Sequence, residues 1–365
     1  MKVAIVHYWL VNMRGGEKML EALLEMFPGA DIFTHVYNPK AVSQLINSCN
    51  VITSGINRLP FAKKIYQLYM PLMPGALLEF DLQGYDLVIS SEAGPAKGVV
   101  PNPGAYHLCY CHSPMRYLWD MYHEYFRKAN PFVKFFMKRM IPSLRLWDIA
   151  SSNLVDRFVT NSSYVAKRIR RIYNREAQVV YGPVQTDRFL KLERRPSGYY
   201  LFFGQITAYK RADIAIEACV KSGRKLVVAG AGINKHDKKK YEKTGLVRFI
   251  GKVSDGQAES LFSEARALLY PGIEDLGLIP IEANAAGCPV IAFRGGGVLD
   301  TVRENVTGIF FDDQTPESLI SAMAYFEQNE TLFQDRLQFS RHVQQFSKEA
   351  FKERIQIVLD EKKRI

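Results

Sequence analysis

The chain has 365 residues, a length that predicts two domains rather than one small module, at about 150 residues per domain. Hydrophobic residues make up 47% of the sequence and charged residues 23%, which is ordinary globular usage and excludes extensive disorder. Lys and Arg number 48 against 37 Asp and Glu, a net charge of +11, so the expected partners are anionic: phosphates, nucleic acid or an anionic membrane surface. No apolar run approaches the roughly 18 residues that span a bilayer, so any membrane contact is expected to be peripheral.

The five cysteines are scattered along the chain and odd in number. Together with a first segment that has a strand pattern rather than a secretory leader, they favour a reduced, cytoplasmic compartment. Cys109, Cys111 and His112 resemble a fragment of a zinc site, but no second Cys/His pair stands at ligand spacing in the sequence. We therefore interpret these cysteines as buried thiols.

Short apolar runs alternate with helical patterns along the first half of the chain. Residues 2–7 form the first run, followed by a polar loop with glycines at 12–16 and a periodic helix over 17–26. Three further runs, and the helical segment after the last of them, follow at residues 86–90, 106–110, 157–160 and 164–173. This alternation predicts a parallel sheet with crossover helices.

Between residues 181 and 198 the composition turns to Pro, Gly and charge, which predicts an interdomain linker. The alternation then restarts, with strands expected at 199–203, 225–229, 247–250, 267–270 and 290–293, and helices at 212–220, 257–265 and 279–286. Residues 348–365 read as one amphipathic helix with a basic end. We predict an amino-terminal domain over 1–185, a second domain over 186–345, and a carboxyl-terminal helix over 346–365 that crosses back to the first domain.

Two carboxylates eight residues apart mark the most informative segment. Glu274 follows the strand that ends at residue 270, and Glu282 lies in the next helix, whose first turn fits Pro280. Between them, the backbone N–H groups of Gly277 and Leu278 begin that helix. Such a helix start accepts phosphate, while carboxylates at its margin accept hydrogen bonds from sugar hydroxyls. A solvated acidic turn followed by a surface helix is the alternative that the spacing alone leaves open.

The segment from Glu274 to Glu282 resembles the E-x7-E motif of the retaining glycosyltransferases of family 4. Further segments that resemble this family lie at residues 15–18, 110–117, 160–165, 203–213 and 290–302, so the resemblance covers nearly the whole chain. It favours a bacterial, mannosyltransferase-like branch that builds surface polysaccharides. It implies an α/β fold of the GT-B type, with two Rossmann-like domains whose parallel sheets face each other across a cleft. The second domain would bind the donor and the first the acceptor.

The family resemblance also implies roles for single residues. Glu282 would hold the nucleotide ribose, and Glu274 would contact the transferred sugar at its 3-hydroxyl. Lys210 would neutralise the donor diphosphate, because a fixed cation placed where negative charge develops lowers the barrier to departure of the leaving group.

Gln205 departs from the family pattern, because many relatives have an Arg at this position. An amide can hydrogen-bond phosphate but supplies no charge. We therefore expect Lys210, helped by Arg211 or Arg294, to carry more of the charge neutralisation.

In the first domain, Gly15 and Gly16 follow a strand and precede a helix, but their spacing is not that of a dinucleotide-binding loop. The resemblance implies that these glycines let the backbone approach the donor, whereas a tight turn is the alternative. His112 stands just after the strand at 106–110, where residues of a binding cleft are expected. The resemblance places His112 beside the transferred sugar, where it would donate to a hydroxyl or stabilise the oxocarbenium-like centre. A purely structural histidine is the alternative.

We expect neither a catalytic metal nor a cofactor. No Asp-x-Asp follows a strand of the second domain, and Asp312 and Asp313 read as a polar turn. Basic side chains and the helix beginning at Leu278 would replace a cation at the diphosphate. The retaining stereochemistry of the family implies attack on the face from which the diphosphate departs, with the leaving phosphate as the base.

Most of the excess positive charge lies in one stretch of the first domain. Residues 126–175 carry twelve Lys and Arg against two Asp. Within this stretch, residues 132–141 interleave large apolar and basic side chains, as does the segment 58–73, in a pattern typical of interfacial helices. We expect these segments to rest on an anionic membrane surface and to present a lipid-linked acceptor. A core-packing helix with a solvated basic face is the alternative for each.

The sequence therefore predicts a retaining, metal-independent hexosyltransferase. The expected reaction moves mannose from GDP-mannose onto a lipid-linked oligosaccharide in surface polysaccharide synthesis, at the inner face of the plasma membrane. Alternatives are a UDP- or dTDP-sugar donor on the same fold, a nucleotide-sugar epimerase, and a non-catalytic scaffold, to which Gln205 gives some weight. We expect no nucleic-acid partner, since the sequence contains no recognised nucleic-acid module.

Overall fold

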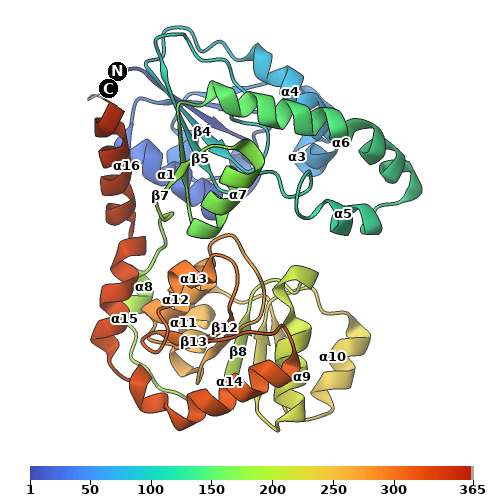
Figure 1. Ribbon diagram of the computed structural model, residues 1–365, viewed down its shortest axis with the longest axis vertical. Coiled ribbons are helices and arrows are strands. Elements are labelled where there is room, and N and C mark those ends of the chain that lie inside the picture. Colours follow the sequence, from blue (N-terminus) through green and yellow to red (C-terminus); the bar gives the residue numbers. More distant parts are fainter. Residues whose placement is uncertain (363–365) are drawn as a thin grey trace. The chain divides into compact units, whose positions relative to one another are not determined.

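The computed structural model describes residues 1–362 and divides the chain into two compact units (Figure 1). Unit 1 comprises Met1–Pro183 together with the carboxyl-terminal residues from Lys352 onward, and unit 2 comprises Val184–Phe351. The break between Pro183 and Val184 lies two residues before the boundary expected from composition. Each unit contains one parallel sheet with helices on its faces, so both have the α/β architecture of a Rossmann-like domain.

Unit 1 is built on a seven-stranded sheet with the order β3-β2-β1-β4-β5-β6-β7, and every pairing in it is parallel. Its strands are β1 Val3–His7, β2 Asp31–Thr34, β3 Val51–Thr53, β4 Leu87–Glu92, β5 Tyr106–Cys111, β6 Arg157–Thr160 and β7 Ala177–Val179. Its α-helices are α1 Gly15–Met26, α2 Gln44–Asn47, α3 Ala62–Ile65, α4 Met73–Ala76, α5 Tyr122–Lys128, α6 Pro131–Ser151 and α7 Ser163–Tyr173. Short 3₁₀ helices are η1 Pro39–Ala41, η2 Gly55–Arg58, η3 Tyr66–Leu72, η4 Leu77–Glu79 and η5 Ser152–Leu154.

The order of strands reverses between β1 and β4. From β1 the chain first adds β2 and β3 on one side of the sheet and then returns to place β4 on the other side. In register, His7 at the end of β1 lies opposite Ser91 near the end of β4. Open α/β sheets bind ligands beyond the carboxyl ends of the strands at such a reversal, so His7 and Ser91 mark the expected binding edge of unit 1.

Helix α1 begins two residues earlier than the sequence pattern indicates. We expected a loop through Gly16 and a helix from Glu17, but Gly15 and Gly16 form the first turn of α1. The carboxylate of Glu17 accepts a hydrogen bond from the backbone N–H of Arg14 at 2.8 Å, which makes Arg14 the residue before the helix and Glu17 its third residue. The two glycines are therefore fixed in helical geometry at the helix start.

A buried ion cluster anchors the end of β4. The ammonium of Lys97 is fully buried between the carboxylates of Glu92, at 3.4 Å, and Asp148, which it also contacts. Two backbone N–H groups, those of Ala96 and Lys97, donate to Glu92, and the indole N–H of Trp119 donates to Asp148. With these hydrogen bonds in place the buried charges are compensated, so β4 and α6 are tied together through polar contacts.

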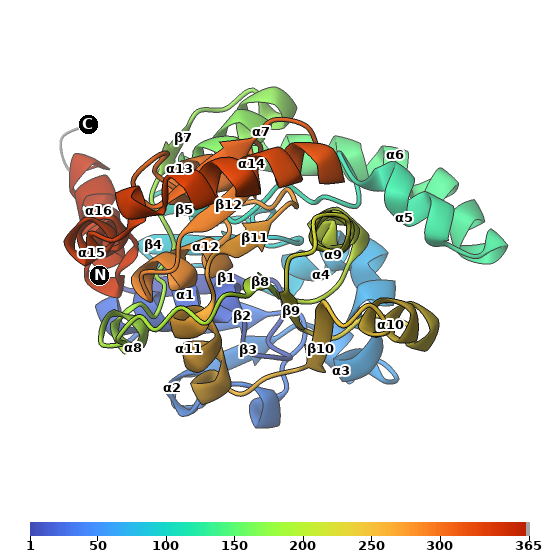
Figure 2. The same ribbon diagram turned by 90° about the horizontal axis from the view of Figure 1, so that it is seen from below.

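Helices α5 and α6 form a hairpin that extends away from the sheet of unit 1, as both views show (Figures 1 and 2). No residue from 131 to 140 is buried, whereas the second half of α6 packs Ile141 and Asp148 into the unit. The segment 58–73, which we expected to be one amphipathic helix, is instead divided among η2, α3 and η3. Phe61, in the left-handed region with a φ of 54°, and Pro71 interrupt it.

Unit 2 is built on a six-stranded parallel sheet with the order β10-β9-β8-β11-β12-β13. Its strands are β8 Tyr200–Phe203, β9 Leu226–Ala229, β10 Val247–Gly251, β11 Leu268–Tyr270, β12 Val290–Phe293 and β13 Gly308–Phe311. Its α-helices are α8 Asp187–Leu190, α9 Ala212–Lys221, α10 Lys235–Glu242, α11 Asp255–Glu264, α12 Leu278–Ala285, α13 Val298–Thr301, α14 Pro316–Gln328 and α15 Arg336–Val343, with 3₁₀ helices η6 Ala208–Lys210, η7 Glu330–Phe333 and η8 Gln344–Phe346. The strand order reverses between β8 and β11, which places the binding edge of this sheet after Phe203 and Tyr270.

The last helix, α16 Lys348–Lys362, begins in unit 2 and continues in unit 1. Within unit 1 it is held by two ion pairs, between Lys352 and Glu25 at 2.5 Å and between Glu361 and Arg157 at 2.8 Å. The basic end that we expected at residues 363–365 lies outside the described residues.

Candidate active site

Lys210 and Glu274 meet at the binding edge of unit 2. Lys210 ends η6, just after β8, and Glu274 lies in the loop after β11, the neighbouring strand. The Lys210 ammonium is 2.9 Å from Oε1 of Glu274, and both side chains are only partly exposed. Sixty-four positions apart in the sequence, the two residues are brought together because their strands are adjacent at the reversal of strand order.

Three glycines allow the loops around this ion pair to pack closely. A Cβ on Gly272 would lie 2.6 Å from Cα of Lys210, and one on Gly297 would lie 2.1 Å from the carbonyl oxygen of Asp275. The N–H of Gly297 donates to the carbonyl of Glu274 at 2.9 Å, and Gly296 has a φ of +83°. Only residues without a side chain permit this approach, so the glycine loop after β12 fixes the main chain of Glu274.

The start of α12 lies a few residues beyond Glu274. Gly277 precedes the helix in the left-handed region, with a φ of +87°, and Leu278 is its first residue. Leu278 is 37% exposed, so the first turn of α12 is accessible. The hydroxyl of Tyr270 is buried beside Glu274, and burial together with the Glu274 carboxylate raises the pKa of Tyr270 well above its usual value. Sequence analysis missed Tyr270, although its place as the last residue of a strand was visible.

Glu282 lies one turn further along α12. Burial raises the pKa of its carboxyl from 4.5 to about 7; the nearby Arg188 acts to lower this pKa, and Asp255 acts to raise it. Arg188 is itself paired with Asp255 at 3.0 Å. The Glu282 carboxyl makes no hydrogen bond to any other part of residues 1–362 and is free to accept from a ligand.

The three remaining donor-site candidates of unit 2 have different surroundings. Gln205 is exposed in the loop after β8. Arg211 pairs with Asp213, two residues on, at 3.0 Å. Arg294 is paired with both Glu304, at 2.7 Å, and Asp312, at 2.6 Å, so its charge is already neutralised within the unit.

The first-domain candidates gather at the binding edge of unit 1. His112 directly follows β5, and its Nε2 is 3.0 Å from Oγ of Ser91. Burial lowers the pKa of His112 to about 3, and the neighbouring His7 lowers it as well, so the ring is neutral at physiological pH. A Cβ on Gly16 would lie 2.5 Å from the Tyr8 hydroxyl, which explains a glycine here. Gly15 is exposed at the start of α1.

Sequence analysis missed Glu17, His7 and Ser91 as part of this cluster. Nδ1 of His7 is 2.9 Å from Oγ of Ser91, and Nε2 of His7 is 3.8 Å from Oε1 of Glu17. All three side chains are buried. The signal that could have found them is the position of His7 and Ser91 at the ends of their strands, together with the acidic residue in the first turn of α1.

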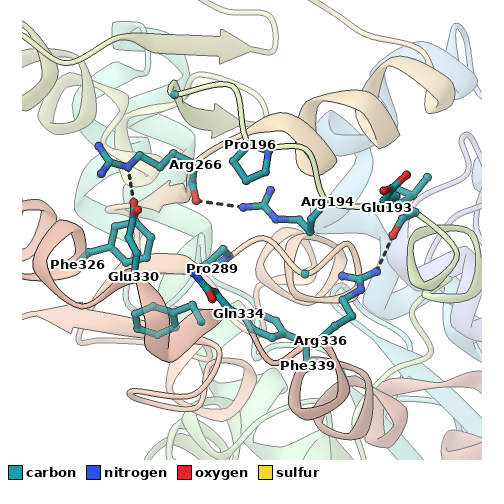
Figure 3. A pocket seen from close by; sticks show the side chains of 14 residues that line it. Glu193, Arg194, Pro196, Arg266, Pro289, Phe326, Glu330, Gln334, Arg336 and Phe339 are labelled. Carbon is teal, nitrogen blue, oxygen red and sulfur yellow. Dashed lines mark hydrogen bonds and ion pairs between the residues drawn. The ribbon is translucent and has the colours of Figure 1, made fainter.

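A cavity of about 670 Å³ lies elsewhere in unit 2 (Figure 3). It is lined by side chains that include Arg194, Arg336 and Phe326, and by none of the site residues expected from sequence. Arg194 donates to main-chain carbonyls at the end of α11, such as that of Ala265 at 2.6 Å, and Arg336 donates to the carbonyl of Phe189 at 3.1 Å. These guanidinium groups therefore act as helix-end caps that hold the linker to the domain.

Residues 1–362 offer neither a cluster of metal ligands nor a membrane-spanning helix. Within that range, His, Cys, Asp and Glu side chains do not form any group of three or more that could hold a metal ion. All five cysteines are free thiols, and Cys109 and Cys111 are buried in an apolar cluster with Phe158. Among the helices described, none is long and apolar enough to cross a membrane.

Both halves of the chain match glycosyltransferase family models. Residues 13–188 match the model described as Glycosyltransferase Family 4, and residues 184–353 match Glycosyl transferases group 1. Among curated proteins, D-inositol 3-phosphate glycosyltransferase of Streptomyces griseus is 28% identical over 220 residues, which cover 48% of this chain and 47% of that protein. Alpha-1,3/1,6-mannosyltransferase ALG2 of Mus musculus is 26% identical over 255 residues, covering 60% of this chain and 59% of ALG2. The alignments thus span about half of the length of these relatives.

Solved structures share the fold over almost the entire chain. Anabaena Alr3699/HepE in complex with UDP aligns with a TM-score of 0.72 at 15% identity, covering 99% of this chain and all of the other. The lipopolysaccharide outer core galactosyltransferase WaaB aligns with a TM-score of 0.69 at 14% identity, with 99% and 100% coverage. Two Rossmann-like units, each matched by its own glycosyltransferase model, together show that the chain belongs to the GT-B glycosyltransferases.

Proposed function

We propose that the protein is a retaining glycosyltransferase that moves a hexose from a nucleoside diphosphate sugar to a lipid-linked saccharide in surface polysaccharide synthesis. The observation that carries this proposal is the Lys210–Glu274 pair at the reversal of strand order in unit 2, next to the accessible start of α12. This arrangement offers one cation, one carboxylate that can accept from a hydroxyl, and the backbone N–H groups of the first turn of α12. A sugar diphosphate requires the same three features.

In the proposed reaction, the bond between C1 of the sugar and the diphosphate oxygen breaks while C1 bonds to the acceptor hydroxyl on the same face. The proton of that hydroxyl passes to the leaving phosphate, so no protein nucleophile is required. Lys210 and the first N–H groups of α12, at Leu278, stabilise the negative charge that develops on the diphosphate. Gln205 and Arg211 assist at the phosphates, without a metal ion.

The two carboxylates bind hydroxyl groups of the donor, Glu274 those of the transferred sugar and Glu282 those of the ribose. Glu274 leaves its partner Lys210 in part to accept a hydrogen bond from a hydroxyl of the transferred sugar, which we assign to the 3-hydroxyl. Glu282, whose carboxyl makes no hydrogen bond to another of the residues 1–362, accepts from the ribose. His112 contacts a hydroxyl of the saccharide. Arg294 is a weaker candidate for the diphosphate, since Glu304 and Asp312 already hold its guanidinium.

We propose GDP-mannose as the donor, following the mannosyltransferase-like sequence pattern and in keeping with the name of the mouse relative. A uridine donor is the second candidate. It is favoured by Alr3699/HepE, a protein of the same fold whose structure was solved in complex with UDP-glucose. Both candidates use the same diphosphate site.

A thermal-shift panel without added metal tests the proposal, using GDP-mannose, UDP-glucose, UDP-N-acetylglucosamine, dTDP-rhamnose and the free diphosphates. A donor at 100 times its Kd stabilises the fold by about 2.7 kcal/mol, a clearly measurable change in Tm. We expect GDP and GDP-mannose to stabilise the protein and Lys210→Met to abolish that shift. Isomerisation of the donor without an acceptor would indicate an epimerase instead, and no shift with any nucleotide would support a scaffold.

We also propose that the α5–α6 hairpin, residues 122–140, rests on an anionic membrane surface and brings the enzyme to its lipid-linked acceptor. Phe132 and Phe135 are 71% and 66% exposed, and the ammonium groups of Lys134 and Lys138 lie near the ring of Phe126. Exposed aromatic rings interleaved with cations suit the boundary between headgroups and acyl chains. The protein would then act at the cytoplasmic face of the plasma membrane.

Flotation with vesicles tests this docking. We expect the protein to bind vesicles that contain anionic phosphatidylglycerol at low salt, and a Phe132→Ser, Phe135→Ser double variant to lose most of that binding. Leu337→Ser, which removes an exposed apolar side chain from unit 2, serves as the matched control. Equal binding of all three proteins, or binding to neutral vesicles alone, would contradict the proposed docking.

A further inference from the structure

Four side chains of unit 1 form a continuous polar chain that ends at His112. It runs from Glu17 in α1 to His7 at the end of β1, then to Ser91 in β4, and finally to His112 after β5. The separations are 3.8 Å from Glu17 Oε1 to His7 Nε2, 2.9 Å from His7 Nδ1 to Ser91 Oγ, and 3.0 Å from Ser91 Oγ to His112 Nε2. The ring of His7 is stacked on that of Tyr8, with centroids 4.2 Å apart, so its orientation is fixed.

The two ends of this row of side chains, Glu17 and His112, differ in charge. At one end, burial raises the pKa of Glu17, but the His7 ring and the N–H groups of Glu17 and Arg14 lower it further, so the carboxylate is ionised. At the other end, burial lowers the pKa of His112 to about 3, so its ring is neutral and carries one proton on either Nδ1 or Nε2. Nδ1 of His112 has no hydrogen-bond partner among residues 1–362.

The direction of each hydrogen bond between Glu17 and His112 follows from the buried carboxylate of Glu17. Nε2 of His7 lies 3.8 Å from Oε1 of Glu17, and the ionised carboxylate favours an N–H rather than a lone pair pointing toward it. When the single ring proton of His7 is on Nε2, Nδ1 has a lone pair and accepts from the Ser91 hydroxyl, 2.9 Å away. The Ser91 oxygen must then accept from His112, which therefore carries its proton on Nε2.

We propose that Glu17, His7 and Ser91 are positioning residues that fix the tautomer of His112, so that its Nδ1 presents a lone pair to the bound saccharide. This inference rests on the proposed function only in assigning the saccharide as the ligand of His112. It differs from one of the two roles expected from sequence, donation to a sugar hydroxyl, because a lone pair at Nδ1 accepts a hydrogen bond from such a hydroxyl. The same lone pair faces any positive charge that develops on the sugar ring.

Glu17→Gln should reverse the direction of hydrogen-bond donation from His7 to His112, and the reason is structural. The second carboxylate oxygen of Glu17 accepts the backbone N–H of Arg14 at 2.8 Å, and in a glutamine only the amide oxygen can take this role. The amide NH₂ would then face Nε2 of His7 and donate to it. His7 would carry its proton on Nδ1, Ser91 would donate to His112, and His112 would carry its proton on Nδ1.

Nitrogen-15 NMR of the imidazole rings in the full chain measures these tautomers directly. His107 and His342 serve as internal references, since Nδ1 of His107 faces the carbonyl of Leu154 at 2.7 Å and Nε2 of His342 faces that of Thr301 at 2.9 Å. A carbonyl can only accept, so each reference has a known tautomer. In the unaltered protein we expect His7 and His112 to carry their protons on Nε2. A proton on Nδ1 of His112 would overturn the proposal, whether or not any variant folds.

The variants add a functional arm. We expect Glu17→Gln to move the His112 proton to Nδ1 and to lower kcat for sugar transfer about tenfold, with the thermal shift by the nucleoside diphosphate unchanged. Glu21→Gln, one turn further along α1 and paired with Lys18, is the matched control and should change neither the spectrum nor kcat. An unchanged His112 tautomer in folded Glu17→Gln would refute the inference. If no donor or acceptor supports transfer, the proposed function fails, while the NMR result still decides the tautomer.

Discussion

Replacing Glu282 with Gln should stabilise the ligand-free protein at pH 8 while it weakens nucleotide binding. Burial raises the pKa of the Glu282 carboxyl from 4.5 to about 7. Between these two pH values the native protein holds a proton that the unfolded chain has released. The stabilisation from this proton is therefore complete below pH 4.5, falls as the pH rises, and is lost above about pH 7.

The size of the effect follows from the shift in pKa. At 1.36 kcal/mol for each unit, a rise from 4.5 to about 7 corresponds to about 3 kcal/mol, which partial exposure of the side chain reduces to about 2 kcal/mol. A glutamine is uncharged at every pH and avoids this cost. At about 2–4 °C for each kcal/mol in a domain of this size, Glu282→Gln should raise Tm by about 4–8 °C at pH 8 and change it little at pH 5.

Thermal unfolding of both proteins at pH 5 and pH 8 measures this difference. Glu264→Gln, which removes an exposed carboxylate at the end of α11, is the control and should leave Tm unchanged at both pH values. We also expect Glu282→Gln to lose most of the shift produced by a nucleotide, because the ribose would lose its charged acceptor. If the unaltered protein and Glu282→Gln show the same dependence of Tm on pH, the reasoning from burial is refuted.

Three further variants test other parts of the structure. Lys210→Met should lower kcat/KM at least 100-fold with little change in Tm, whereas Lys221→Met, which removes an exposed lysine paired with Glu317, should leave kcat/KM unchanged; steady-state kinetics with both variants distinguishes a site cation from a surface charge. Gly297→Ala should lower Tm because its Cβ would collide with the carbonyl of Asp275, while Gly256→Ala, which has open space in α11, should leave Tm unchanged or slightly higher; equal effects would contradict the close packing of the glycine loop. Lys97→Met should cost about 3–5 kcal/mol in the free energy of unfolding, since two buried carboxylates lose their cation; urea denaturation measures this, and an unchanged midpoint would contradict it.

The sequence by itself determined part of the succession of strands and helices. Among residues 1–362, nine of the thirteen strands were predicted, those at 157–160 and 290–293 with their observed bounds and the rest within one or two residues. Strands β2, β3, β7 and β13 were not predicted. The nine could be predicted because parallel strands covered on both faces are short, continuous apolar runs, which stand out between helical patterns. The start of α1 was misplaced because a side-chain contact, that of Glu17 with the N–H of Arg14, decides where this helix begins.

The sequence also indicated which residue types the site would use, but only the tertiary structure decided which of them touch. Lys210 and Glu274 were expected to have separate roles, and they form an ion pair because β8 and β11 are adjacent in the sheet. Arg294 was expected to help Lys210 at the diphosphate, yet two carboxylates from other segments pair with it.

The chain from Glu17 to His112 was invisible in the sequence for the same reason. His7 and Ser91 are 84 positions apart, and they meet only because the register of β1 and β4 places them side by side at the end of the sheet. Local patterns specify elements through propensity and burial, whereas contacts between elements depend on strand order and register. The residue types at the proposed site could therefore be predicted from the sequence, whereas the distances between them depend on strand order and register in the folded protein.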